Sequence, residues 1–219
     1  MNDFYKQSAF VQWTVSILMF IASGFVMYSW ILLMEKSIVG ILYIFIATPV
    51  TQFLISPIMK MTKVYSYLSP MLLVYAASDK KYDLHNGTTF DYIYAYKRKR
   101  AGIRWQNQLL MWYIEGLLVI ADRLKEGSIP KTIEIRGSSY FFSERTAQRM
   151  GFRVGKTGAP EKINLAINYL DLLWMYSLAK GKLTFPNLSA IKTASTSGGE
   201  LLENEEKLRS LLGFLEKRK

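Results

Sequence analysis

The sequence predicts a membrane protein with three parts: an N-terminal hairpin of two transmembrane helices, a small cytoplasmic α/β (or α+β) domain, and a C-terminal amphipathic helix. Two observations predict this order. Residues 7–34 and 37–59 are uncharged and are separated only by Glu35 and Lys36. Beyond residue 60, charged residues are frequent and segments with helix-like and strand-like periodicity alternate, as in a folded domain with a sheet.

The first part, residues 1–60, contains two uncharged runs that are each long enough to cross a bilayer. About 20 apolar residues in a helix cross a hydrocarbon core of about 30 Å, because a helix satisfies its own backbone hydrogen bonds. We predict helices at about 8–34 and 37–59. The first run exceeds the 7–15 apolar residues, roughly, of a signal peptide, and no small-residue cleavage site follows it. The short connection makes the pair an antiparallel hairpin.

The distribution of charge predicts the orientation of the hairpin. The chain holds 28 Lys and Arg against 17 Asp and Glu, a net charge of +11. The four charges before residue 60 cancel, so the excess lies in residues 60–219. The positive-inside rule therefore predicts an integral, multi-pass membrane protein with both termini in the cytoplasm. Neither span contains an ionisable residue, which favours an anchor over an ion pathway.

We assign residues 64–188 to the cytoplasmic domain. Its first segment, 64–78, is uncharged but too short to span a bilayer, and either lies along the headgroups or contains a buried strand at 71–75. Phe90–Tyr96 can pair with that strand across a turn at residues 85–88, which contains Asn-Gly. His85 is the only histidine; it is either an acid or base near neutral pH or a local turn residue. No metal site is expected.

The rest of this domain alternates helices and strands. The expected elements are a helix over Trp105–Lys125, a strand over Thr132–Arg136, a turn at Gly137–Ser139, a short helix capped by Ser143, a strand over Phe152–Val154, and a helix from Pro160 to about Ala179. Residues 189–199 are rich in Ser, Thr and Gly and predict a flexible linker.

Residues 200–219 predict the C-terminal amphipathic helix. Ser197 and Glu200 form a capping box, and four leucines then line one side of the helix: Leu201, Leu208, Leu212 and Leu215. Three roles stay open for this helix: docking on the domain, pairing with a protein partner or a second copy, and adhering to the membrane.

Familiar catalytic signatures are absent from the sequence. The lack of cysteine excludes disulfides, thiolate metal sites and cysteine nucleophiles. The nucleophile-elbow, phosphate-loop and zinc-protease motifs are also missing. These absences favour a protein without catalytic activity.

One stretch, however, is similar to a known family. The turn Lys99-Arg100-Ala101-Gly102-Ile103-Arg104, the long helix and strand after it, and the segment 147–152 together resemble the back half of the GNAT N-acyltransferases. In that family a basic-x-x-Gly-x-Gly/Ala turn opens a helix whose N-terminal amides hold the pyrophosphate of acyl-coenzyme A. The resemblance implies that Gly102 and Ile103 bind that thioester.

The turn belongs to a basic cluster made up of Lys97, Arg98, Lys99, Arg100 and Arg104. Such a cluster beside a membrane anchor can bind anionic lipid headgroups, at about 1 kcal/mol per residue. With the neighbouring tyrosines it can instead stack nucleic-acid bases, although we do not expect that partner because the sequence indicates no groove. The third interpretation is a solvated helix start that enforces topology.

We therefore expect a membrane-anchored interaction or assembly protein whose basic cytoplasmic domain is held against the inner leaflet, with no cofactor. The lipid bilayer is its expected partner. One alternative is a membrane-tethered, GNAT-like acyltransferase that uses an acyl-coenzyme A. The other is a membrane-perturbing effector whose cytoplasmic domain rearranges the hairpin.

Overall fold

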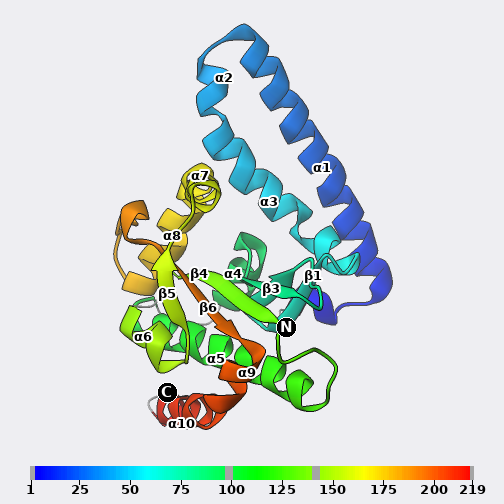
Figure 1. Ribbon diagram of the computed structural model, residues 1–219. Helices are drawn as coiled ribbons and strands as arrows, with labels where there is room; N and C mark the ends of the chain where they lie inside the picture. Colours follow the sequence, from blue (N-terminus) through cyan, green and yellow to red (C-terminus); the bar gives the residue numbers. More distant parts are fainter. Residues whose placement is uncertain (1–2, 97–100, 140–143, 218–219) are drawn as a thin grey trace.

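The computed structural model describes residues 3–96, 101–139 and 144–217. A long helical hairpin projects from one side of a domain built around a single mixed sheet (Figure 1). Two apolar helices followed by an α/β sheet domain confirm the predicted order of the first two parts.

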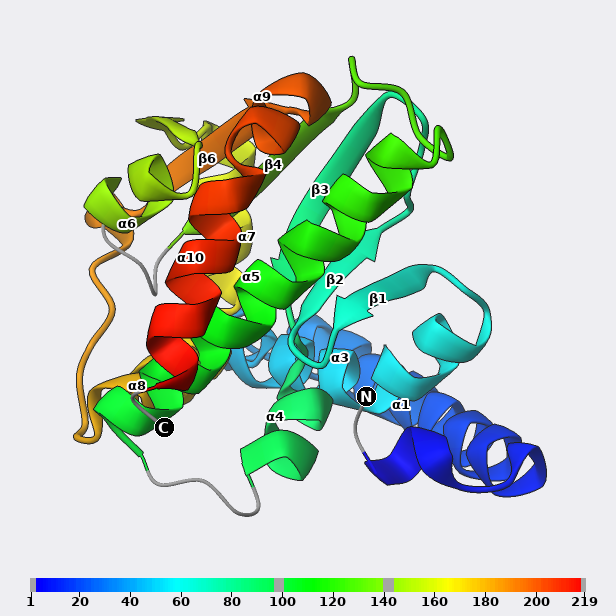
Figure 2. The ribbon, with the colours of Figure 1, turned by 90° about the horizontal axis from the view of Figure 1, so that it is seen from below.

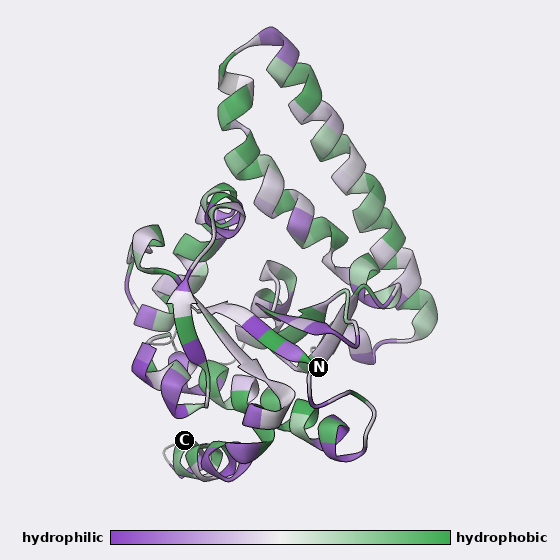
Figure 3. Ribbon diagram, in the orientation of Figure 1, coloured by the Kyte–Doolittle hydropathy of each residue, from purple (hydrophilic) through white to green (hydrophobic). Residues whose placement is uncertain are grey.

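The hairpin consists of α1 (Ala9–Lys36), the single turn α2 (Val39–Leu42) and α3 (Ile44–Met61), preceded by the 3-10 helix η1 (Asp3–Lys6). Segments Ala9–Lys36 and Gly40–Met61 are long and apolar enough to cross a membrane. Hydrophobic residues cover both legs, and hydrophilic residues gather at the tip (Figure 3). The tip is tight because a Cβ on Gly40 would collide with the Leu33 backbone, and Trp30 Nε1 donates to the Gly40 carbonyl at 3.0 Å.

The sheet has six strands in the order β1-β2-β3-β4-β6-β5. They are β1 (Tyr65–Ser69), β2 (Leu72–Tyr75), β3 (Lys81–Asn86), β4 (Glu134–Ser139), β5 (Arg153–Lys156) and β6 (Lys192–Ser197). Neighbouring strands pair antiparallel except β3 and β4, which are parallel. The crossover between that pair contains α4 (Thr89–Tyr96) and α5 (Ile103–Lys125), because parallel strands cannot be joined by a tight turn.

One face of the sheet carries the main hydrophobic core. Val74, Tyr82 and Ile135 point to this face and pack against α5 and the two last helices, α9 (Gly198–Glu203) and α10 (Glu205–Glu216). In Figure 2, α10 lies alongside α5 over this face. The alternate residues, which include Asp83, His85 and Arg136, make the opposite face polar.

The remaining helices are α6 (Glu144–Arg149), α7 (Ala159–Ile167), α8 (Tyr169–Lys180) and the 3-10 helix η2 (Leu188–Ala190). Both α7 and α8 contact α3, so they cover the sheet on the same side as the hairpin. The helix expected between residues 160 and 179 is thus two helices, which meet at Asn168.

Several predictions for the domain are wrong. Residues 189–199 are not a flexible linker, because they contain β6, whose small residues Ala194 and Thr196 alternate into the core. Phe90–Tyr96 forms α4 instead of a strand, since Phe90 and Tyr94 lie one helical turn apart and pack on the same neighbours. The turn expected at 137–139 lies inside β4, which extends to Ser139. Of the turn expected at 85–88, the first two residues belong to β3 and only Gly87 and Thr88 lie in the loop that follows.

The C-terminal segment docks on the domain, which is the first of the three open roles. The predicted capping box is present, with the Ser197 hydroxyl accepting from the Glu200 amide at 3.2 Å. The helix then breaks at Asn204 into α9 and α10. Leu201 and Leu208 are fully buried, so the apolar side of this segment is part of the core.

The base of the hairpin is fixed to the domain by an aromatic cluster. Phe4 of η1 and Phe53 of α3 both contact Phe90 of α4, with ring centroids 5.2 and 5.6 Å from that of Phe90. Phe4, Tyr5 and Phe90 are buried together. The hairpin therefore does not hang from a single peptide connection but shares a small core with the domain.

Beside this cluster lies a buried carboxylate, Asp91, which is 1% exposed. Its Oδ2 accepts hydrogen bonds from the Tyr67 hydroxyl at 2.6 Å and from the Thr88 amide and hydroxyl, each at 2.9 Å. Burial raises the pKa of Tyr67, so this phenol stays a donor. Lys60, at the end of α3, places its Nζ 4.5 Å from the ring centroid of Tyr5. Strand and loop are thus tied to one polar group, and the hairpin packs on a tyrosine beside it.

Replacing Tyr67 by Phe removes a donor to this buried carboxylate. We expect the free energy of unfolding to fall by about 1.5–3 kcal/mol, the range for hydrogen bonds to charged groups. Tyr75→Phe, on the neighbouring strand and 49% exposed, is the matched control and should cost less than about 0.5 kcal/mol. Denaturant unfolding of the detergent-solubilised protein measures both, and equal losses would contradict the role given to Asp91.

Candidate functional site

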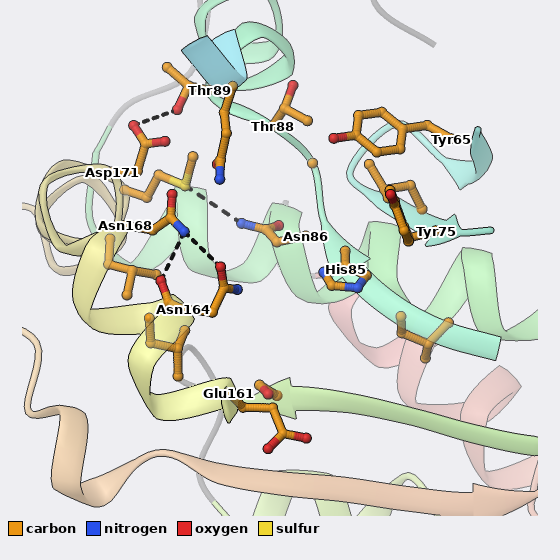
Figure 4. A pocket seen from close by; sticks show the side chains of 18 of the residues that line it. Tyr65, Tyr75, His85, Asn86, Thr88, Thr89, Glu161, Asn164, Asn168 and Asp171 are labelled. Carbon is orange, nitrogen blue, oxygen red and sulfur yellow. Dashed lines mark hydrogen bonds between the residues drawn. The ribbon is translucent and has the colours of Figure 1, made fainter. Parts of the chain in front are cut away.

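A pocket of about 550 Å³ lies between the polar face of the sheet, α3 and α7–α8. Figure 4 shows its polar side chains, which come from the end of β3 on one side and from α7–α8 on the other. The lining residues are Gln52, Ile55, Tyr65, Leu73, Tyr75, Leu84, His85, Asn86, Gly87, Thr88, Thr89, Ser138, Glu161, Asn164, Leu165, Asn168, Asp171, Leu172 and Met175.

The topology of the sheet explains why a pocket forms here. His85 and Asn86 end β3, and Ser138 lies near the end of β4, so the pocket sits at the carboxyl ends of the parallel pair. In open α/β sheets this is where the chain leaves the sheet and ligands bind. The position is therefore the one that the fold itself favours for a ligand.

One wall is an aromatic row across the first three strands. The ring centroids of Tyr65 and Tyr75 are 5.8 Å apart, and that of His85 is 6.2 Å from Tyr75 in an edge-on arrangement. His85 keeps part of its surface exposed, but the protein atoms around the ring displace enough water to lower its pKa below the ordinary 6.5, while Asp83 opposes the shift. The imidazole is therefore neutral at pH 7 and able both to donate and to accept a hydrogen bond.

Asn86 is held in place by its neighbours. Its Oδ1 accepts from the Tyr113 hydroxyl of α5 at 2.6 Å, and its Nδ2 donates to the Tyr92 hydroxyl of α4 at 2.8 Å. These bonds tie the end of β3 to both helices of the crossover. Asn86 therefore acts as a rigid part of the pocket floor.

The opposite wall carries two carboxylates. Asp171 accepts from the Thr89 hydroxyl at 2.7 Å and from Trp174 Nε1 at 3.4 Å, and burial raises its pKa. Glu161 lies 3.7 Å from the Arg136 guanidinium, which partly neutralises its charge. Among the residues that the structure describes, the lining includes no Lys or Arg. The pocket therefore suits a neutral or cationic polar group and disfavours an anion.

Asn168, at the break between α7 and α8, has an unused acceptor. The residue is 9% exposed, and its Nδ2 donates to the carbonyl and Oδ1 of Asn164 at 2.8 and 3.1 Å. Its own Oδ1 is buried and accepts no hydrogen bond in the described part of the chain. A buried acceptor without a donor costs about 1–3 kcal/mol, so a ligand that supplies a donor here gains that energy.

The residues singled out in the sequence lie elsewhere, except His85. Lys97, Arg98, Lys99 and Arg100 fall outside the described residues. Arg104 is exposed in the first turn of α5, and Ile103 beside it is 67% exposed. Neither lines the pocket.

Gly102 has the backbone conformation that a tight turn before a helix requires, with φ of +88°. Its amide is already in use, however, because it donates to the Leu178 carbonyl of α8 at 2.8 Å. The Gly181 backbone packs against the same position. This amide is therefore not available to a phosphate, as the resemblance to acyltransferases would require.

Most pocket residues had no recognisable motif. One signal was present in the sequence: Asn164, Asn168 and Asp171 follow each other at helical spacing within the predicted helix of residues 160–179. Among the described residues, no three His, Asp or Glu side chains gather in a way that could hold a metal ion.

Because His85 is the only histidine in the chain, its ring signal can be followed in a pH titration without overlap from another histidine. We expect the His85 ring signal in a proton NMR titration to report a pKa below 6.5, and Asp83→Asn to lower it further, because Asp83 favours the charged ring. Asp79→Asn, in an exposed turn, should leave it unchanged. Since the folded chain binds fewer protons at His85 than the unfolded chain, this group lowers stability as the pH falls through about 6.5. A pKa at or above 6.5 would contradict the desolvation of the ring.

Comparison with known proteins assigns this site no activity. No family model, no curated protein and no solved structure matches the chain. The function is therefore inferred from the geometry of the pocket and its position beside the hairpin.

Proposed function

We propose that this protein is a membrane-anchored binding protein, in which the hairpin crosses the bilayer and holds the pocket of the cytoplasmic domain at the inner surface. The observation that carries the proposal is the double role of α3. This helix is the second candidate span, and its residues Gln52 and Ile55 form one wall of the pocket. A binding site and a membrane anchor thus share one element.

The junction at the base of the hairpin supports the same function. Because η1, α3 and α4 share buried aromatic residues, the domain has a fixed position relative to the hairpin. Lys60 and Lys63 at the domain end of α3 favour a cytoplasmic location for that end. The pocket is then held at a set height beside the bilayer.

Two other hypotheses receive no support from the geometry. The buried leucines of α9 and α10 belong to the core, so these side chains already pack within the domain. The amide of Gly102 is bonded to Leu178, so it gives the acyltransferase alternative no phosphate site. Binding by the basic cluster to anionic lipid remains compatible with the proposal.

Single cysteines test the orientation, because the chain has no native cysteine. Ser37→Cys places a thiol at the hairpin tip, and Ser128→Cys places one in an exposed loop after α5. A membrane-impermeant maleimide applied to intact cells should label Ser37→Cys and not Ser128→Cys. After permeabilisation both should react. Equal labelling of the two variants in intact cells would mean that the hairpin does not cross the membrane, and the proposal would fail.

A further inference from the structure

The two legs of the hairpin present unequal lengths of surface to lipid. On α1, exposed apolar residues run from Phe10 to Met34, a distance of about 36 Å at about 1.5 Å per residue. This matches the hydrocarbon core of a bilayer, about 30 Å thick. Along α1, therefore, one exposed apolar face runs through the whole membrane thickness, while Val15 and Met19 on another face pack against the aromatic cluster.

The other leg is free over a shorter distance. On α3, the last exposed apolar residue is Val50, and no residue from Thr51 to Lys60 is exposed. Val50 lies 13 residues from Ser37 at the tip, which is about 20 Å along a helix. The hydrocarbon core is about 30 Å thick, so roughly 10 Å of it remains beyond the exposed part of α3. Over this remaining depth α3 is covered by the domain.

The elements that cover α3 carry exposed apolar side chains. α4, α7 and α8 all contact α3, and they expose Ile93, Ile163 and Leu170 by 52, 61 and 42%. We call these three residues the apolar collar. A surface of this kind can enter the boundary between headgroups and acyl chains to a depth of about 5–10 Å. That depth equals the part of the bilayer left over beside α3.

The pocket lies at this same depth. Gln52, on its wall, is 15 residues from Ser37, about 22 Å from the tip and inside the inner leaflet.

The pocket lining contains both apolar and polar side chains. Leu73, Leu165 and Leu172 are buried apolar residues, whereas Asn168 and Asp171 are polar.

We propose, on the basis of the function above, that the pocket takes a single-chain amphiphile from the inner leaflet, with an uncharged or cationic headgroup beside Asn168 and Asp171 and its chain against α3. The buried Oδ1 of Asn168 then receives the donor that it lacks within the described chain. An anionic headgroup meets Asp171 and finds no Lys or Arg among the lining residues. The volume of about 550 Å³ fits a headgroup with the first part of one chain.

The test uses the full-length protein in detergent micelles, with bound amphiphile counted by native mass spectrometry. The probes are monooleoylglycerol, whose headgroup is uncharged, oleoyl lysophosphatidate, whose headgroup is anionic, and glycerol, which has no chain. We expect one monooleoylglycerol per chain and about tenfold weaker binding of the other two.

Two pairs of variants make the result specific. Ser138→Trp fills the pocket and should weaken monooleoylglycerol binding about tenfold, whereas Ser195→Trp, on the same sheet face but outside the pocket, should not. Asp171→Asn should strengthen lysophosphatidate binding relative to monooleoylglycerol, because it removes the charge that repels the anion. A misfolded variant would not produce this gain.

The outcomes separate this inference from the proposed function. Tight binding of glycerol, blocked by Ser138→Trp, would overturn the membrane origin of the ligand and leave a membrane-anchored binding protein for a soluble molecule. Equal binding of both lipids in the wild type, or no effect of Ser138→Trp, would overturn the inference. Failure of the cysteine labelling would instead remove the anchor itself.

Discussion

The carboxylate of Asp91 is the group on which the arrangement of this protein depends. A buried carboxyl group is stable only when it is hydrogen bonded, and removing one of its donors costs about 1.5–3 kcal/mol. Here the donors come from β1 and from the loop that opens α4, and Lys60 of the hairpin lies over the neighbouring tyrosine rings. One buried carboxyl group thus joins β1 to the start of α4, and the hairpin packs on the tyrosines beside it.

That constraint explains why the pocket exists. Thr88, which donates twice to Asp91, is followed at once by Thr89, which donates to Asp171 on α8. The same short loop therefore anchors the hairpin junction and one wall of the pocket.

The sequence predicted the parts that depend on composition over long windows. The two apolar runs, the strand at 71–75, the long helix of α5 and the capping box at Ser197 are present as predicted. It did not predict β6, because this strand consists mainly of Thr, Ser and Ala, which are also common in flexible linkers. Only the pairing with β4 shows that the segment is a strand. The pocket was missed for a related reason. His85 and Asp171 are 86 positions apart, and their meeting depends on the parallel pairing of β3 with β4 and on the docking of α8.

The place of β6 in the sheet also determines when the domain can form. β6 lies between β4 and β5, and β5 has β6 as its partner in the described sheet. Residues 192–197 are synthesised well over 100 residues after the hairpin. Until then β5 and one edge of β4 lack their pairing strand, although the apolar helices have already been synthesised. Domains form as units once their strands are available. The six-stranded sheet can therefore close only after the hairpin and the other five strands have been synthesised.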